Sequence, residues 1–356
     1  MKYALIVLRE GRRSLRGEGY PAVVDAFLSG GVELSEIVLC SLSDGRAIAS
    51  TVTRLKGEYD GVFLTCAEER LGYASDLLSA SGIVLSGGLC EGECLFALIP
   101  ATATGAKAVS LEVVPAIDRQ RKKRYSQIVI RAVMPPPERV EGLIAQAKRM
   151  SGGSLSFSVW DEFGDTRIEI VYDSETPKML ADDVTRLFVS ALDEYVYAVD
   201  DTPLAQRVCD ALSLHRLVLS TAESFTGGSV GREIVSVPGA SKVFYEGLNT
   251  YANESKIERT GVSLLTLKGE GAVSDSVAYE MAAGLIGQGH CDVAVSTTGI
   301  AGPKSDDTNK PVGLCYIAVG TKERVRVYRF HLEGDREKIT QTAKNLALFL
   351  VYKEIK

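Results

Sequence analysis

Apolar runs alternate with amphipathic stretches over the first hundred residues. The aliphatic run at 3–8 is typical of a buried parallel strand, and the stretches at 36–42 and 61–65 are expected to be the second and third strands. Between them, residues 22–28 and 45–56 have the spacing of helices. This βαβαβ order predicts a doubly wound parallel sheet, in which ligands bind at the carboxyl ends of the strands.

The pattern changes near residue 120, where a basic run at 119–124 precedes an expected strand at 126–133. One interpretation of the run is a nucleic-acid contact. We favour a solvated surface, because one short basic cluster in an acidic protein is usually a surface feature. Three prolines at 135–137 end the strand before an expected helix at 138–150. The other expected elements here are a hairpin and a helix, at 154–160, 167–172 and 177–195.

From about residue 203 the chain returns to strands and helices, now with glycine-rich turns after the strands. We expect a helix at 204–212 and strands at 216–220, 243–248 and 292–296. Loops at strand ends are where binding and catalytic residues collect. With 356 residues, the pattern predicts an α/β protein of three domains: a doubly wound sheet at 1–122, a small α+β domain at 123–199 and an α/β domain at 200–356.

Composition narrows the function classes. The chain is 46% hydrophobic and 24% charged, as in soluble globular proteins, and its net charge of -6 disfavours binding to nucleic acid or an anionic membrane. The first apolar run is too short for a signal peptide, and no run approaches the roughly 20 apolar residues of a membrane span. The 7 scattered cysteines are typical of reduced thiols, and the 3 separated histidines do not have the spacing of a metal site. We therefore expect a cytoplasmic protein without a nucleic-acid or membrane partner.

Ser224 stands just after an aliphatic strand and just before a glycine-rich turn. In that place its hydroxyl could be a nucleophile, with the amides of Thr226 and Gly227 as an oxyanion hole or a phosphate cradle. A serine before a helix is more often an N-cap, and by itself Ser224 favours that interpretation.

Two further segments carry candidate chemistry. Residues 250–256 bring together a phenol, an amide and an amine in Tyr251, Asn253 and Lys256. A lysine whose pKa is lowered by burial can activate a serine without histidine, although spacing alone favours an exposed lysine. The small residues at 297–303 would let a ligand approach the backbone, but they match neither a P-loop nor a dinucleotide fingerprint.

Taken in order, these segments resemble the C-terminal domain of the competence/damage-inducible CinA family, also known as the nicotinamide-nucleotide amidase family. The similarity extends over some 130 residues in seven ordered motifs. These are Ala222-Glu223-Ser224-x-Thr226-Gly227-Gly228, Val237-Pro238-Gly239-Ala240-Ser241, Thr250-Tyr251-x-Asn253-x-x-Lys256, Gly271-Ala272-Val273-Ser274, Thr298-Gly299-Ile300-Ala301-Gly302-Pro303, Lys310-Pro311-Val312-Gly313 and Gly334-Asp335-Arg336.

The resemblance implies hydrolysis of nicotinamide mononucleotide to nicotinate mononucleotide and ammonia in pyridine-nucleotide salvage, with no metal or other cofactor. It implies Ser224 as the nucleophile, Lys256 as its base and Tyr251 as a partner in proton transfer or positioning. It also suggests a homodimer. The substrate-binding residues that it implies are Thr226, Gly227, Gly228, Asn253, Thr298, Gly299, Ala301, Gly302 and Arg336.

Two positions depart from the family pattern. Phe225 stands where cysteine is common, and Thr340 stands where a second arginine is often found. Either change could lower affinity or rate. The alternative function is therefore a nucleotide-binding or regulatory protein without turnover.

Full-length family members begin with a domain resembling molybdopterin-binding proteins, to which an ADP-ribose pyrophosphatase activity is attributed, followed by a KH-like domain. The three segments here fit that order, but residues 9–13 and 66–70 lack the hallmark loops. A metal-dependent pyrophosphatase needs oxygen ligands for a divalent ion. The acids near the expected strand ends are Glu10, Asp44, Glu68 and Glu69. Because arginines crowd three of them, we predict a degenerate first domain, with a metal-dependent pyrophosphatase as the remaining alternative.

Overall fold

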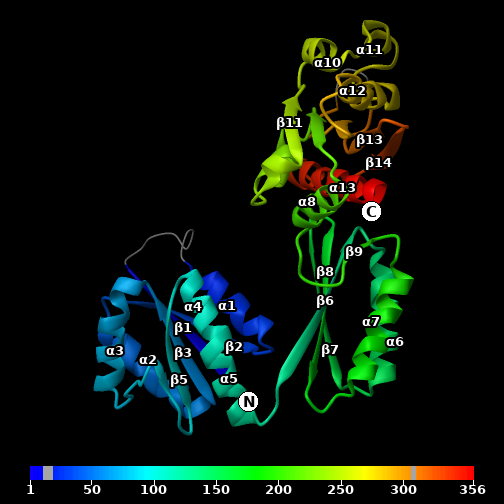
Figure 1. The fold of residues 1–356 in the computed structure, drawn as a ribbon. Helices are drawn as coiled ribbons and strands as arrows, with labels where there is room; N and C mark the ends of the chain where they lie inside the picture. The colour runs from blue at the N-terminus through cyan, green and yellow to red at the C-terminus, as the bar shows by residue number, and fades with distance from the viewer. Residues whose placement is uncertain (11–18, 306–309) are drawn as a thin grey trace. The chain divides into compact units, whose positions relative to one another are not determined.

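The structure, a computed structural model, describes residues 1–10, 19–305 and 310–356 (Figure 1). It confirms a mixed α/β protein, with one sheet in each of the three segments expected from the sequence. The chain forms two compact units, residues 1–127, 148–156 and 170–182 in one and residues 128–147, 157–169 and 183–356 in the other. Because the middle segment contributes to both units, the boundaries near 122 and 200 stay a prediction.

The first sheet has the strand order β2-β1-β3-β5-β4. Its first four strands in that order run parallel, as expected, and β4 is antiparallel to β5. Ala4 and Ile6 of β1 pack with α2 and α3, whereas Leu5 and Val7 pack on the opposite face with α1 and α5. The elements are β1 (Tyr3–Arg9), α1 (Tyr20–Ser29), β2 (Leu34–Ser41), α2 (Gly45–Glu58), β3 (Gly61–Cys66), η1 (Glu68–Arg70), α3 (Leu71–Ala80), β4 (Leu89–Cys90), β5 (Leu95–Pro100), α4 (Ala103–Ala108), η2 (Val109–Val113) and α5 (Val114–Arg121).

The middle sheet has the order β7-β8-β6-β9 and contains the expected hairpin. The helix expected over 177–195 is shorter than predicted, and a strand that the sequence pattern did not reveal, β9, follows it and pairs with β6. The apolar spacing continued past the helix end because Leu192, directly after the helix, is itself buried. The elements are β6 (Tyr125–Val133), α6 (Pro137–Ser151), β7 (Leu155–Glu162), β8 (Asp165–Asp173), α7 (Lys178–Ala191) and β9 (Val196–Ala198).

Cations of the basic run at 119–124 are paired with nearby acids. Arg119 lies 2.6 Å from Glu91, and Lys123 lies 2.9 Å from Asp173. Pairing of this kind favours the interpretation of a surface feature over that of a nucleic-acid contact.

The last sheet has the order β11-β10-β12-β13-β14. The first three of these strands are parallel, and β13 and β14 are antiparallel to their neighbours. Helices α8 and α13 cover one face of the sheet and α12 covers the other (Figure 1). None of the described helices is both long and apolar enough to cross a membrane. The elements are α8 (Leu204–His215), β10 (Leu219–Glu223), α9 (Ser229–Val235), η3 (Ala240–Lys242), β11 (Phe244–Asn249), α10 (Asn253–Thr260), α11 (Leu264–Glu270), α12 (Asp275–Gly287), β12 (Val293–Gly299), β13 (Leu314–Thr321), β14 (Val325–His331) and α13 (Arg336–Ile355).

Two strands of this sheet extend beyond the ends expected from the sequence. β10 continues to Glu223 rather than ending at 220, and β12 continues to Gly299 rather than ending at 296. The added residues are polar or small, so the apolar pattern stops before the strands do. Their burial is possible because the tertiary structure supplies hydrogen-bond partners for polar side chains such as Glu223 and Thr297.

Candidate active site

Ser224 and Lys256 are in direct contact although 32 positions separate them. Ser224 directly follows β10, and Lys256 lies in α10. Lys256 Nζ is 3.0 Å from Ser224 Oγ and donates to the backbone carbonyls of Thr250, at 2.8 Å, and Tyr251, at 3.0 Å. Only 1% of Lys256 and 8% of Ser224 is exposed. The buried lysine thus lies where a base for a serine nucleophile must lie.

Burial also changes the acidity of this lysine. It lowers the pKa of Lys256 from 10.5 to about 8, and the charge of Glu254 partly opposes the shift. After deprotonation, the two remaining N–H groups can still donate to the carbonyls of Thr250 and Tyr251. The free lone pair can then face the hydroxyl of Ser224. This geometry permits the amine to accept the proton of Ser224 near neutral pH.

Glu223 is a buried carboxylate whose role the sequence pattern did not reveal. It ends β10 directly before Ser224, and only 1% of it is exposed. Its oxygens accept five hydrogen bonds, from the amides of Gly228, Val230 and Gly231 and from the hydroxyls of Thr221 and Thr226. The signal available in the sequence is an acid at the end of an apolar strand, just before two glycines and a helix.

Two backbone amides of the turn after Ser224 already donate hydrogen bonds within the protein. Gly227 N donates to the carbonyl of Ser224 at 3.1 Å, and Gly228 N donates to Glu223 at 3.0 Å. The expectation that the Gly227 amide faces an oxyanion or phosphate is therefore corrected. In the described part of the chain, the amides of Phe225 and Thr226 form no hydrogen bond, so they are the donors left for an oxyanion.

The hydroxyl of Thr226 is also engaged. It lies 2.8 Å from Glu223 Oε2 and 2.7 Å from Thr297 Oγ1, in a buried setting. Thr226 can therefore offer its backbone N–H to a substrate more readily than its side chain. Substrate contact by Thr226 stays a prediction.

Arg336 donates hydrogen bonds to both Tyr251 and Gly302. The Arg336 guanidinium donates to the Gly302 carbonyl at 2.8 Å and to the Tyr251 hydroxyl at 3.4 Å. Tyr251 is 63% exposed, and Asn253, at the start of α10, is exposed as well. A guanidinium has five N–H donors, so Arg336 keeps donors for an anionic group.

Residues 298–302, which are the end of β12 and the turn after it, are mostly buried. Thr298 Oγ1 donates to the Ala272 carbonyl at 2.6 Å and so holds the adjacent turn. A side chain at Gly299 would approach Cys315 Cβ to 2.5 Å, which only glycine avoids. Ala301 is buried in the core. These contacts explain the residue types, while substrate contact by Thr298, Gly299, Ala301 and Gly302 stays a prediction.

The two positions that depart from the family pattern have structural roles. The Phe225 ring is buried and belongs to the apolar core under α8 and α13. Thr340 Oγ1 donates to the carbonyls of Arg336, at 2.9 Å, and Glu337, at 3.0 Å, in its own helix. Neither side chain contacts Ser224 or Lys256 through a hydrogen bond in the described residues.

The corresponding edge of the first sheet is built differently. Glu10 and Arg70 form an ion pair there, and both side chains are more than half exposed. With Leu42, Ser43 and Tyr73 they line a hollow of about 310 Å³. Among the described residues, no group of three or more His, Cys, Asp and Glu side chains is placed to hold a metal ion. Residues 11–13 of the altered loop lie outside the described residues, so the lack of pyrophosphatase activity stays a prediction.

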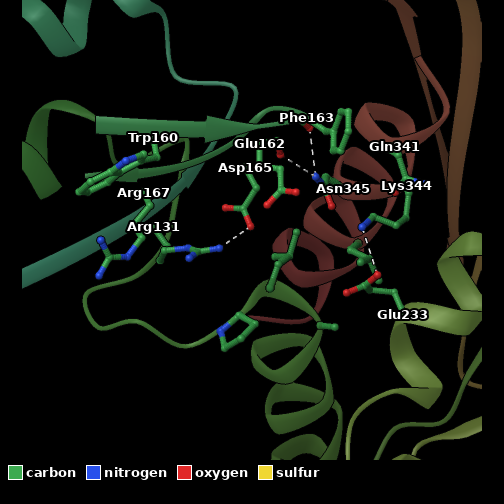
Figure 2. A pocket seen from close by; sticks show the side chains of 14 residues that line it. Arg131, Trp160, Glu162, Phe163, Asp165, Arg167, Glu233, Gln341, Lys344 and Asn345 are labelled. Carbon is green, nitrogen blue, oxygen red and sulfur yellow. Dashed lines mark hydrogen bonds and ion pairs between the residues drawn. The ribbon is translucent and has the colours of Figure 1, made fainter. Parts of the chain in front are cut away.

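A separate hollow of about 380 Å³ lies between the hairpin of the middle sheet and α13, within the second unit (Figure 2). Arg131 is 2.7 Å from Asp165, and Lys344 is 3.1 Å from Glu233. Because these charges are paired within the protein, the hollow has no evident preference for a ligand charge. It does not include Ser224.

Comparisons with known proteins agree with the motifs. A family model described as the CinA C-terminal domain matches residues 201–355. A CinA-like protein of Fusobacterium nucleatum is 41% identical over 190 residues, which are 53% of this chain and 46% of that protein. A CinA-like protein of Kosmotoga olearia is 44% identical over 160 residues, 45% of this chain and 39% of that protein. The matches thus span less than half of each of these two relatives.

A solved structure of a competence/damage inducible protein, CihA from Agrobacterium tumefaciens, is 34% identical. The match covers 41% of this chain and 90% of that protein, with a TM-score of 0.40. The family model over residues 201–355 and the identity to these CinA-like relatives, together with the ordered motifs around Ser224 and Lys256, show that the chain belongs to the CinA family.

Proposed function

We propose that this protein is a nicotinamide-mononucleotide amidohydrolase of pyridine-nucleotide salvage. It would convert nicotinamide mononucleotide and water to nicotinate mononucleotide and ammonia. The observation that supports this best is the 3.0 Å contact between Lys256 Nζ and Ser224 Oγ in a buried setting. Amide hydrolysis needs a nucleophile, a base that later returns a proton, and donors for an oxyanion.

The reaction would begin when neutral Lys256 accepts the hydroxyl proton as Ser224 Oγ bonds to the carboxamide carbon. The amides of Phe225 and Thr226 are the candidate donors to the carbonyl oxygen as it becomes negative. The Lys256 ammonium then protonates the amide nitrogen, and the C–N bond breaks. Ammonia departs, and the nicotinoyl group of the nucleotide stays bound to Ser224 as an ester. Water then bonds to the ester carbon and gives a proton to the same amine, which returns a proton to Ser224 Oγ as the ester bond breaks and nicotinate mononucleotide leaves.

This chemistry uses no metal or other cofactor, and a divalent ion would be needed only by an active first domain. We further propose that the enzyme acts as a homodimer in the cytoplasm. Its partner is the small nucleotide, with no nucleic acid or membrane involved. Size-exclusion chromatography with light scattering tests the dimer directly.

The decisive experiment incubates the purified protein with nicotinamide mononucleotide and measures ammonia and nicotinate mononucleotide together. We expect equal amounts of both products, and a rate at least about 1,000-fold lower for Ser224→Ala. Ser229→Ala is the matched control, because Ser229 lies in the same turn region and its hydroxyl has no hydrogen-bond partner among the described residues.

Equal ammonia release by the wild type and Ser224→Ala would remove Ser224 as the nucleophile. Nucleotide binding by calorimetry without product from the wild type would instead support the nucleotide-binding or regulatory alternative.

A further inference from the structure

Glu223 occupies a place where other proteins bind anions. Backbone amides at the start of a helix carry partial positive charge and attract phosphate or carboxylate groups. Here the amides of Gly228, Val230 and Gly231 all donate to the Glu223 carboxylate, at 2.8 to 3.0 Å. The protein therefore supplies its own anion to this turn.

The same residue connects both members of the catalytic pair. The Glu223 carbonyl accepts the Thr250 amide at 2.7 Å, and the Thr250 carbonyl accepts Lys256 Nζ at 2.8 Å. On the other side, the Glu223 carboxylate accepts the Thr226 hydroxyl in the turn that begins with Ser224. A displacement of Glu223 would thus change the position of Ser224 relative to Lys256.

The backbone partners of Glu223 match the acceptor oxygens of a carboxylate. Backbone amides can only donate, and an ionised carboxylate only accepts, so the match is complete. A glutamine in this place would point its own N–H groups at one or more of these donors. A buried donor without an acceptor is costly, so the turn would shift to relieve it.

We infer that Glu223 is a positioning residue for the proposed hydrolysis: its carboxylate fills the anion-binding amides of the turn and sets the distance between Ser224 and Lys256. A consequence is that the substrate phosphate cannot bind to these amides and must be recognised elsewhere. The inference rests on the proposed function for its kinetic measurements, but its structural part can be tested without substrate.

The first test is Glu223→Gln, which keeps the size of the side chain and removes its charge. We expect kcat to fall by about 10- to 100-fold with KM within about threefold, because an error of about 1 Å in the position of a reacting group costs up to about 100-fold. Glu223→Asp, which keeps the charge, should retain more of the wild-type kcat than Glu223→Gln.

The matched control is Glu280→Gln. Glu280 also holds the start of a helix, accepting the Ser263 amide at 2.8 Å and the Thr266 hydroxyl at 2.6 Å. It makes no hydrogen bond to the turn after Ser224 in the described structure. We expect both variants to lose thermal stability, but only Glu223→Gln to lose kcat. That result would show that Glu223 positions the reacting groups and does more than stabilise the fold.

The second test is chemical rescue of Glu223→Ala. This variant leaves two buried amides, of Val230 and Gly231, and the partly buried amide of Gly228 without an acceptor, and a space of carboxylate size. We expect formate to raise its melting temperature and to restore kcat at least about tenfold in a saturable manner, since a small anion can replace the missing group. Sodium chloride at equal ionic strength should do neither, and formate should leave the wild type unchanged.

Two results would overturn the inference. One is wild-type kcat in Glu223→Gln, and the other is a folded Glu223→Ala variant whose melting temperature and kcat do not respond to formate. The melting experiment needs no substrate, so it decides the structural part even if the protein does not hydrolyse nicotinamide mononucleotide.

Discussion

The first and last sheets share an arrangement but differ in what lies at the ends of their strands. Each contains three parallel strands in the same spatial order, β2-β1-β3 in one and β11-β10-β12 in the other. After β10, Ser224 is buried in contact with Lys256. After β1, Glu10 is paired with Arg70, and both are largely exposed.

This difference shows that topology determines where a site can be, whereas burial determines what its residues can do. An exposed ion pair is screened by water and contributes little to stability. A buried amine without a carboxylate partner instead has a lowered pKa, which makes it useful as a base near neutral pH. We therefore expect measurable hydrolysis from the last sheet and none from the first.

We predict the largest loss of hydrolysis for a variant that lacks the buried amine of Lys256. Lys256→Met should lower kcat/KM for nicotinamide mononucleotide by about 100- to 10,000-fold, because it removes the proposed base for Ser224. Steady-state ammonia release measures it. Lys344→Met is the control, since Lys344 is a largely buried lysine of the same unit that pairs with Glu233 instead. Near-wild-type activity in Lys256→Met would show that Lys256 is not the base.

A smaller effect is expected from pH. Lys256 acts as a base only when deprotonated, and its pKa is about 8, so activity should increase as pH rises through about 8. Between pH 7 and pH 9 the neutral fraction grows about tenfold, and kcat/KM should follow it. The rate is measured in buffers of constant ionic strength. A flat profile, or one that falls over this range, would contradict the assigned role of Lys256.

The smallest effect should come from the first sheet. Arg70→Ala should leave ammonia release unchanged and alter the free energy of unfolding by less than about 1 kcal/mol, because the Glu10–Arg70 pair is exposed. Arg336→Ala, in the other site, should lower ammonia release about tenfold or more through lost charged hydrogen bonds.

With ADP-ribose and magnesium or manganese, the wild type should release no AMP. Metal-dependent AMP release that is lost in Arg70→Ala would show that the first sheet carries its own activity, and the contrast between the two sheets would fail.

The order of the first five elements, from β1 to β3, could be predicted because β1 and β3 are continuous apolar runs, whereas the elements from η1 to α5 were not predicted. The run at 3–8 corresponds to β1 (Tyr3–Arg9), and the run at 61–65 to β3 (Gly61–Cys66). Prediction failed where buried residues are polar, as at the end of β10, because hydrophobicity no longer marks burial there. The sequence pattern also did not reveal β9, because this strand is too short to show an alternation of apolar and polar residues.

By itself, the sequence determined the residue types and their order: a serine after a strand, a lysine 32 positions later, and glycine-rich turns in a pattern similar to one family. Only the tertiary structure decided that Lys256 is buried against Ser224 and that Glu223 fills the turn beside them. The physical reason is that a pKa and a hydrogen bond depend on distance and water exclusion. Those are set when Ser224, which follows β10, and Lys256 of α10 are brought into contact by the fold.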